Sequence, residues 1–450
     1  MTQKKSAVVD MTHGPIARHL IYFCLPLLIG NVFQLLYNTV DTLVVGNFVG
    51  TQALAAVGST GSIINMVVLF FNGFSIGGGV IIGQAYGAKD FDRLHRSIET
   101  TMAMTFIASV ILTIFSVLMV PVMLTWMATP ADVVEAATIY LRIYFAGLPG
   151  LLVYNMGSGI LRAVGDTKRP LYFLILTSIL NIVLDLVFVL IFKMGIAGVA
   201  IATILSELIS ALAVLYLLLK TDDIYKLTLA DLRLDKDIFR RIVAIGLPAG
   251  FQSMITGFSN IFVQAYVNRL GTAAMAGWSC YGKLDMFVFL PIQSMAQAST
   301  TFVSQNIGAG QEDRANEGTA RAMQLIFAIT FAIAAVLFII APQATGFFSK
   351  DSEVIRYGVL FLRMNIFFIT LNAVNHVLAG ALRGRGDAKG PMLIMITCFV
   401  VLRQIYLFIA TRIAYNPYVV GFGYPVGWTS CFIVEVVYYL VVHKYKKVRR

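Results

Sequence analysis

Long apolar stretches separated by short polar segments follow one another along the whole chain. Twelve of them reach about 20 residues or more, the length that an α-helix needs to cross the hydrocarbon core of a bilayer. The alternating segments of about ten residues that mark a membrane β-barrel are not present. The pattern therefore predicts an all-α polytopic membrane protein with twelve transmembrane helices. The predicted spans are residues 16–46, 52–85, 92–122, 132–163, 169–193, 196–220, 239–270, 273–305, 315–342, 353–383, 390–415 and 424–443.

The two halves of the chain repeat each other. The segment GTQALAAVG from Gly50 resembles GTAAMAGWS from Gly271 at an offset of 221 residues. At the same offset, QAYGAKDFDR from Gln84 resembles QNIGAGQEDR from Gln305. A third pair, ILRAVGDTKRP and ALRGRGDAKGP, has this offset too. Three matches at one offset indicate an internal duplication.

One long polar connection separates the halves, and each half holds six predicted spans. An even number of spans gives the halves parallel topology, an arrangement found in transporters that work by alternating access. We expect an N-lobe at residues 1–220, a cytoplasmic linker at 221–238 and a C-lobe at 239–450 that ends in a basic tail. The two pseudo-symmetric six-helix lobes would face each other across a central cleft.

Charge adds a topology to this picture. The net charge is +11, and most of the 34 Lys and Arg residues fall near the termini and in alternate loops. The opposite loops hold only Lys193, Arg269, Lys350, Arg356 and Arg412. The positive-inside rule then places both termini in the cytoplasm and explains the charge without a nucleic-acid partner. We expect a monomer in a bacterial-type plasma membrane, with the lipid bilayer and small-molecule substrates as partners.

The N-terminus lacks the apolar core and cleavage site of a signal peptide, so we expect no processing. The four cysteines lie in apolar stretches without metal-ligand spacing, and we expect neither a disulfide nor a metal site from them.

Two carboxylates lie at membrane depth, where a charged side chain costs several kcal/mol. Asp41 lies near the end of the first span, while Asp185 follows Asn181 by four residues, on the same helix face. With Thr203, both carboxylates would lie roughly 10–12 Å below the outer surface, given a rise of ~1.5 Å per residue. Two neighbouring carboxylates in a low dielectric cannot both stay charged, so they would share Na⁺ or take up a proton.

The chain resembles the multidrug and toxic compound extrusion (MATE) family over nearly its whole length. The resemblance rests on the spacing of Pro26, Asp41 and Gly46, and on the motifs ALAAVG, GQAYGAK and LRAVGDTKRP in this order. It implies twelve helices in two lobes and cation-driven export of amphiphilic compounds. It also implies that the protein is not an enzyme and needs no cofactor beyond the coupling ion.

In one branch of that family the coupling site in the N-lobe uses an Asp, an Asn, an Asp and a Thr. The resemblance assigns these roles to Asp41, Asn181, Asp185 and Thr203, a possible Na⁺ site, and makes Asn155 a further candidate. H⁺ and Na⁺ both stay open as the coupling ion. Another branch has an acidic residue on helix 7, where this chain has Thr256 instead. The repeat partners of the two aspartates, Val263 and Tyr406, are not acidic either. We therefore expect ion coupling in the N-lobe alone.

Loading of this site is expected to bend the first helix at Pro26, although a packing role for Pro26 is equally compatible with the sequence. Polar and soft side chains elsewhere could line the cleft, since aromatic and Met surfaces adapt to varied apolar cations. These residues are Gln34, Tyr37, Asn38, Met66, Gln252, Asn260, Gln293, Met295, Gln297 and Arg403. For most of them a purely structural role is the simpler interpretation. Arg403 in particular could anchor an anionic substrate or pair with an acid such as Glu435.

Two other functions are compatible with parts of the sequence. A flippase for a lipid-linked precursor would share the two-lobe architecture, but it should show a strongly cationic cavity. Few basic residues fall within spans away from their ends: Arg142, Lys283, Arg363 and Arg403. An intramembrane aspartyl protease is suggested only by the GRGD sequence that ends at Asp387. That sequence lies in a basic loop and has a repeat counterpart at Asp166, so it indicates a structural turn.

Overall fold

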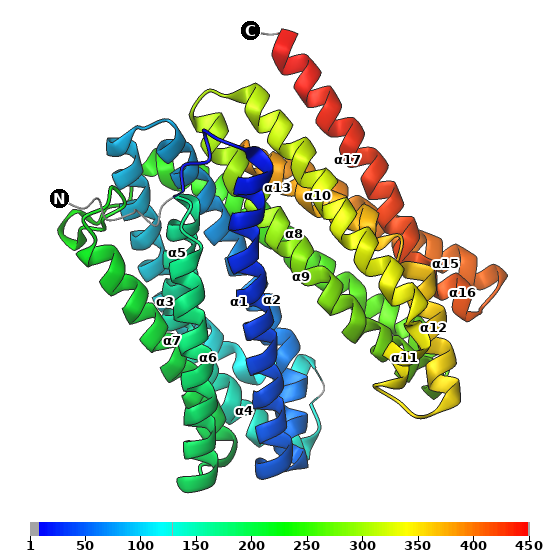
Figure 1. The fold of residues 1–450 in the computed structure, drawn as a ribbon. Helices are drawn as coiled ribbons and strands as arrows, with labels where there is room; N and C mark the ends of the chain where they lie inside the picture. The colour runs from blue at the N-terminus through cyan, green and yellow to red at the C-terminus, as the bar shows by residue number, and fades with distance from the viewer. Residues whose placement is uncertain (1–8, 128, 449–450) are drawn as a thin grey trace. The chain divides into compact units, whose positions relative to one another are not determined.

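The computed structural model describes residues 9–127 and 129–448, with side chains as far as residue 442. Lys4, Lys5, Arg449 and Arg450, which contribute to the topology prediction, lie outside these residues, and the side chains of the other C-terminal lysines are likewise not described. Within the described part of the chain every regular element is helical (Figure 1). The prediction of an all-α fold is therefore confirmed.

The first half contains α1 (Ile16–Val44), η1 (Val45–Val49), α2 (Thr51–Gly87), α3 (Phe91–Trp126), α4 (Ala131–Ala146), α5 (Leu148–Ala163), α6 (Lys168–Leu186), η2 (Val187–Ile191), α7 (Gly195–Lys220) and η3 (Leu229–Asp231). The second half contains α8 (Lys236–Asn268), α9 (Thr272–Gly308), α10 (Glu312–Ile339), α11 (Ala341–Gly346), α12 (Ser352–Asn365), α13 (Ile369–Gly384), α14 (Lys389–Ile396), η4 (Thr397–Leu402), α15 (Arg403–Ile413), α16 (Pro417–Gly421) and α17 (Gly423–Val448). Elements η1, η2 and η4 are π-helical, and η3 is a 3₁₀ turn.

Each predicted span corresponds to helical structure. Among the described residues, nine helical segments are long and apolar enough to cross a membrane, and two bent helix pairs raise this number to 11. The pairs are α4 with α5, bent by 46°, and α12 with α13, bent by 51°. The remaining predicted span, residues 273–305, forms the 37-residue helix α9, whose interior includes Lys283 and Asp285. It is long enough to span a bilayer but is not among the segments that are apolar enough over a membrane-spanning length.

The backbone repeats as the sequence does. Helices α2 and α9 both have 37 residues, and α5 and α13 both have 16. The loops after α5 and α13 turn at Gly165 and Gly386, each with φ of +91°. The next residue in each loop, Asp166 or Asp387, accepts hydrogen bonds from backbone N–H groups of the following helix, at 3.1 Å from Lys168 and 2.9 Å from Gly390. Both aspartates therefore cap helices, which accounts for the GRGD sequence without catalysis.

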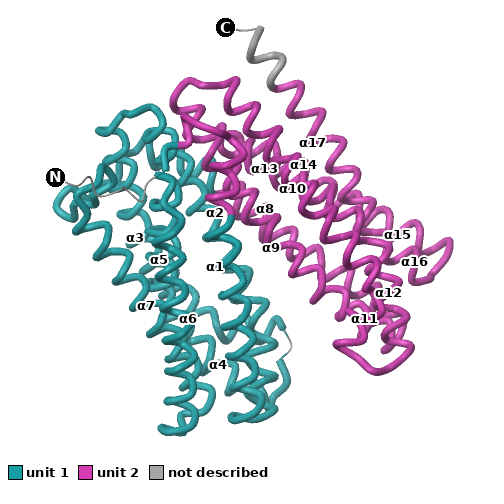
Figure 2. The backbone as a smooth tube through the Cα atoms, in the orientation of Figure 1, with its two compact units in different colours: residues 1–10, 25–246 teal, residues 11–24, 247–450 magenta. Residues whose placement is uncertain are grey.

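The chain divides into two compact units (Figure 2), and the division differs from the expected lobes in two places. Unit 1 comprises residues 1–10 and 25–246, while unit 2 comprises residues 11–24 and 247–450. The expected linker and the first turns of α8 thus belong to unit 1, and the first turns of α1 belong to unit 2.

Close packing explains both differences. In unit 2, the backbone N–H of Met11 donates to Gln305 at 3.1 Å, and Arg314 donates to the Met11 carbonyl oxygen. In unit 1, a Cβ atom on Gly77 of α2 would lie 2.6 Å from the carbonyl oxygen of Ile242 on α8. Only glycine allows this approach, so the glycine-rich stretch of α2 is a helix-packing surface.

Helix α5 lies at the centre of unit 1, packed against α2, α3 and α7, and its repeat partner α13 contacts α9, α10 and α17 in unit 2. Both central helices are buried along most of their length. Segment 221–235 is folded onto unit 1: the ring of Tyr225 is fully buried, and its hydroxyl donates to Asp223 at 2.8 Å. The helices that pack around α5 in unit 1 therefore position the polar residues of the candidate site.

Candidate functional site

The predicted ion site is assembled from three helices of unit 1. Asp41 lies on the last turn of α1, Asn181 and Asp185 lie near the end of α6, and Thr203 lies in the first half of α7. Both carboxylate-bearing helices change to π-helix within a few residues of the acid, at Val45 and Val187. Single π-helical turns often mark functional sites, because the extra residue re-aims the neighbouring side chains.

A hydrophobic cluster brings these helix ends together. Its buried members come from the end of α1 with η1, the start of α2, α4, η2 and α7: Val44, Val45, Ala53, Tyr140, Val189, Val199 and Ala200. Val44 follows Asp41 by three residues, and Val189 follows Asp185 by four. The packing of apolar neighbours therefore places the two acids near each other, and their carboxyl groups lie close enough to interact electrostatically.

Several buried polar atoms of this site have no hydrogen-bond partner among the described residues. Asp185 has no exposed surface and Asn181 has 1%. Buried and without a hydrogen bond are Oδ1 of Asp41, both carboxylate oxygens of Asp185, and both amide atoms of Asn181. Almost all buried polar groups in proteins are hydrogen-bonded, so a cluster of orphaned atoms indicates a place for something else.

Thr203 is close to this group but differs in one respect. Its hydroxyl donates to the carbonyl oxygen of Val199 at 3.0 Å, which leaves the oxygen lone pairs free to accept or to coordinate. No group of three or more His, Cys, Asp and Glu side chains within the described residues is placed to hold a metal ion. The donor set is thus two carboxylates with amide and hydroxyl oxygens, which suits Na⁺ or a proton.

A small polar cavity of about 40 Å³ lies against this cluster. Its lining residues, from α1, α5, α6 and α7, are Gln34, Tyr37, Leu151, Tyr154, Asn155, Leu174, Thr177, Ser178, Asn181, Thr203, Ser206, Glu207 and Ser210. Five residues predicted from the sequence are thereby brought together: Gln34, Tyr37, Asn155, Asn181 and Thr203.

Glu207 is a functional candidate that the sequence analysis missed. Its signal was present, because Thr203, Ser206, Glu207 and Ser210 follow one another at helical spacing and form a polar stripe on α7. Because this stripe lies within a long hydrophobic run, the hydrophobic pattern alone does not distinguish it from an ordinary membrane span. The packing of α7 against α5 and α6 is what turns the stripe into the cavity.

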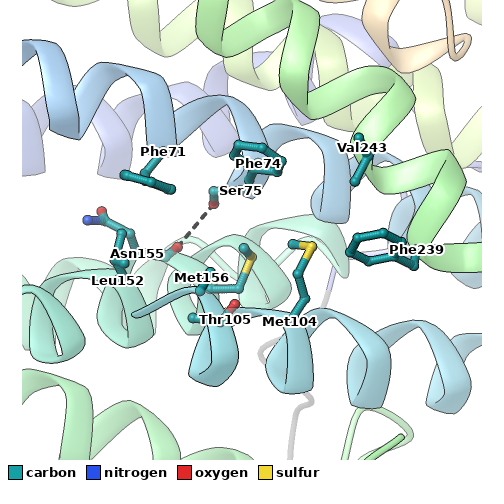
Figure 3. A pocket seen from close by; sticks show the side chains of 11 residues that line it. Phe71, Phe74, Ser75, Met104, Thr105, Leu152, Asn155, Met156, Phe239 and Val243 are labelled. Carbon is teal, nitrogen blue, oxygen red and sulfur yellow. Dashed lines mark hydrogen bonds between the residues drawn. The ribbon is translucent and has the colours of Figure 1, made fainter. Parts of the chain in front are cut away.

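A second, larger cavity of about 270 Å³ also has Asn155 in its wall (Figure 3). It is lined by Phe71, Phe74 and Ser75 from α2, Met104, Thr105 and Ala108 from α3, Leu152, Asn155 and Met156 from α5, and Phe239 and Val243 from α8. The Ser75 hydroxyl donates to the backbone carbonyl of Asn155 at 3.1 Å and joins α2 to α5. Aromatic rings and methionines give this cavity an adaptable apolar wall.

The other predicted cleft residues do not line these two cavities. In unit 1, Asn38 is exposed and Met66 is half-buried. In unit 2, Met295 is buried in the interior, and buried Gln252 accepts a hydrogen bond from Arg383 at 3.4 Å. Asn260 and Gln293 are exposed and Gln297 is half-buried.

Arg403 has a structural role with different partners from those expected. It donates to the Ser259 hydroxyl at 2.6 Å and to the Asn260 side chain at 3.0 Å, and its guanidinium lies 4.8 Å from the centre of the Tyr424 ring. The expected pairing with Glu435 is wrong, since Glu435 lies beside Cys431 instead. Helix packing, rather than charge, selects neutral partners for this arginine.

The structure contains two repeated helical units, and their helices are long enough to cross a membrane. Unit 1 also holds buried carboxylate oxygens that have no hydrogen-bond partner among the described residues. Together these features define a membrane transporter with an internal duplication. The family model described as MatE matches residues 26–187 and 248–409, one match in each half of the chain. The chain therefore belongs to the MATE family of transporters, as the resemblance indicates, and is not an enzyme.

Individual members of this family are also similar to the chain. The chain is 28% identical over 458 residues to the probable multidrug resistance protein YoeA of Bacillus subtilis, an alignment that covers 100% of this chain and 98% of that protein. A crystal structure of MATE in the bent conformation matches with a TM-score of 0.93 at 24% identity, covering 99% of both chains. A structure of MATE in the straight conformation matches with a TM-score of 0.90 at 25% identity, again over 99% of both chains.

Proposed function

We propose that this protein is a multidrug exporter that couples entry of H⁺ or Na⁺ at the site of Asp41, Asn181, Asp185 and Thr203 to the export of amphiphilic, cationic small molecules. The observation that carries the proposal is the set of buried, orphaned polar atoms on Asp41, Asn181 and Asp185. The similarity to YoeA, a probable multidrug resistance protein, supports the multidrug part.

The chemistry of the cluster suits a coupling ion. Two interacting carboxylates in a low dielectric repel each other until a cation or a proton neutralises one of them. Asp41 and Asp185 sit on different helices, α1 and α6, so neutralisation changes the force between those helices. Na⁺ would be held by oxygens of Asp41, Asn181, Asp185 and Thr203, whereas a proton would need one carboxylate only.

Pro26 offers a hinge for the response. It lies inside α1, where its missing N–H removes one helical hydrogen bond. Residues 11–24 belong to unit 2 and the chain from Leu25 belongs to unit 1, so the passage between the units falls beside Pro26. The existence of MATE structures in bent and straight conformations is in line with such a movement.

The proposal also includes the oligomeric state, the location and the topology of the protein. The exporter acts as a monomer in the cell membrane, with both termini in the cytoplasm. Substrates leave by alternating access, and no nucleic acid takes part.

A flippase is the weaker candidate. It needs basic groups to hold a diphosphate, whereas the polar cavity of unit 1 is lined by Glu207 and by no Lys or Arg. This cavity favours a cation over an anion.

Transport in everted membrane vesicles tests the proposal. Vesicles that contain the protein should take up ethidium, a fluorescent monocation, when a Na⁺ gradient or a pH gradient is imposed separately. Uptake under one gradient only identifies the ion. Absence of uptake under both gradients, with protein present in the membrane, would contradict ion-coupled export. Glu317→Gln serves as a control, because its side chain is 61% exposed and lies on α10, away from the cluster.

A further inference from the structure

Glu207 brings a carboxyl group to the polar cavity but stands apart from the Asp41–Asp185 pair. It lines the cavity together with Thr203, Ser206 and Ser210 on the same face of α7. The three carboxylates do not form a group that could hold a metal ion, as judged over the described residues. Glu207 is therefore not grouped with the two aspartates in a metal-binding cluster among the described residues, and it needs its own explanation.

Among the described residues, no Lys, Arg or His forms an ion pair with Glu207. Asp41 is the charged group whose field reaches it, and this charge has the same sign. A carboxylate inside a membrane bundle is expensive unless it is paired. A positive charge brought by a ligand would complete the site.

The position of Glu207 is fixed by close packing. A Cβ atom on Gly150 of α5 would lie 3.1 Å from the backbone nitrogen of Leu208 and 3.4 Å from the carbonyl carbon of Glu207. The two backbones can approach this closely because residue 150 has no side chain. The stretch of α5 that follows, from Leu151 to Asn155, shares the cavity wall with Glu207.

The neighbouring groups match an organic cation rather than a bare ion. Tyr37 and Tyr154 line the same cavity, and aromatic faces attract ammonium and other soft cations. Asn155 lines this cavity and the apolar cavity of about 270 Å³ as well (Figure 3). An apolar space and an acidic space thus share one wall residue, which is the layout that an amphiphilic cation requires.

We propose that Glu207 binds the positively charged group of the exported substrate, while the apolar part of the same molecule occupies the cavity lined by Phe71, Phe74, Met104 and Met156. Glu207 would then decide which substrates are accepted, and Asp41 with Asp185 would supply the driving force. This inference rests on the proposed function but is separable from it, because substrate binding needs no ion gradient.

The test compares two probes of similar shape and different charge. Tetraphenylphosphonium is a permanent cation, and triphenylphosphine oxide is neutral. Their binding to the purified full-length protein in detergent is measured by isothermal titration calorimetry. Glu207→Gln should weaken binding of tetraphenylphosphonium by about tenfold or more, because it removes the carboxylate charge that attracts this cation, and should change binding of triphenylphosphine oxide by less than about twofold.

Two further variants keep the result interpretable. Glu207→Asp retains the charge and should recover most of the preference for the cation, which a purely structural role would not predict. Glu317→Gln, an exposed acid on α10, should leave both dissociation constants unchanged. The proposal is overturned if Glu207→Gln binds tetraphenylphosphonium as the wild type does, or if it loses both probes equally. Failure of ion-driven uptake in vesicles would leave this binding result intact, so the two proposals can fail separately.

Discussion

The carboxyl groups of Asp41 on α1 and Asp185 on α6 interact electrostatically inside unit 1, although the two residues are far apart in the sequence. Oδ1 of Asp41 and both oxygens of Asp185 are buried without a hydrogen-bond partner. A pair of this kind is costly to fold, and its retention points to a role beyond stability.

Neutral substitution of this pair should separate function from folding. We expect Asp41→Asn and Asp185→Asn each to reduce gradient-driven ethidium uptake in everted vesicles to the background level. The double variant should be no worse than either single one, because the two groups act as a unit. Melting temperatures in detergent should not fall, since removal of an unpaired buried charge relieves a desolvation cost. Full uptake by either single variant would contradict the assignment.

The contact between α2 and α8 should tolerate no side chain at Gly77. Its Cβ would meet the Ile242 carbonyl oxygen at 2.6 Å, which is backbone and cannot rotate away. We expect Gly77→Val to destabilise the protein by about 1–3 kcal/mol through overpacking, seen as a lower melting temperature and yield. The matched control is Gly61→Ala on the same helix, where a Cβ meets nothing within 4 Å. A stable Gly77→Val variant would show that α8 does not pack here.

Filling the apolar cavity should block large substrates without unfolding the protein. Ala108 lines this cavity, so Ala108→Phe would occupy part of its volume of about 270 Å³. We expect ethidium uptake to fall several-fold while the melting temperature stays the same or rises, because a filled void gains packing contacts. Ile111→Phe is the control, three residues further along α3 with 60% of its surface exposed. Equal uptake by both variants would exclude the cavity from the transport route.

Even a conservative replacement of Arg403 should destabilise the protein. A lysine cannot reproduce its two hydrogen bonds to Ser259 and Asn260 together with the stacking on Tyr424. We expect Arg403→Lys to lower the free energy of unfolding by about 1–3 kcal/mol, followed as the melting temperature in detergent. Arg412→Lys, which changes an exposed arginine near the end of α15, should have no measurable effect. An unchanged melting temperature for Arg403→Lys would mean that these contacts contribute nothing to stability.

Much of the site was visible in the sequence because the bilayer makes polar residues conspicuous. Asp41, Asn181, Asp185 and Thr203 stand out in apolar runs, and family resemblance groups them. Glu207 was not visible in the same way, since one acid within a helix can face lipid, a neighbouring helix or a cavity. Its direction depends on how α7 packs against α5 and α6, and local sequence does not specify that packing.

The sequence by itself determined the class of fold, the duplication and the approximate spans, because the length of an apolar run and its recurrence are properties of the chain alone. Only the tertiary structure decided that residues 11–24 pack with unit 2, that the first turns of α8 pack with unit 1, and that Arg403 meets neutral partners. These outcomes depend on close contacts such as Gly77 against Ile242, in which distant segments must fit each other in shape. The hydrophobic pattern determines which residues are buried, whereas the steric fit between helices determines which residues those buried side chains contact.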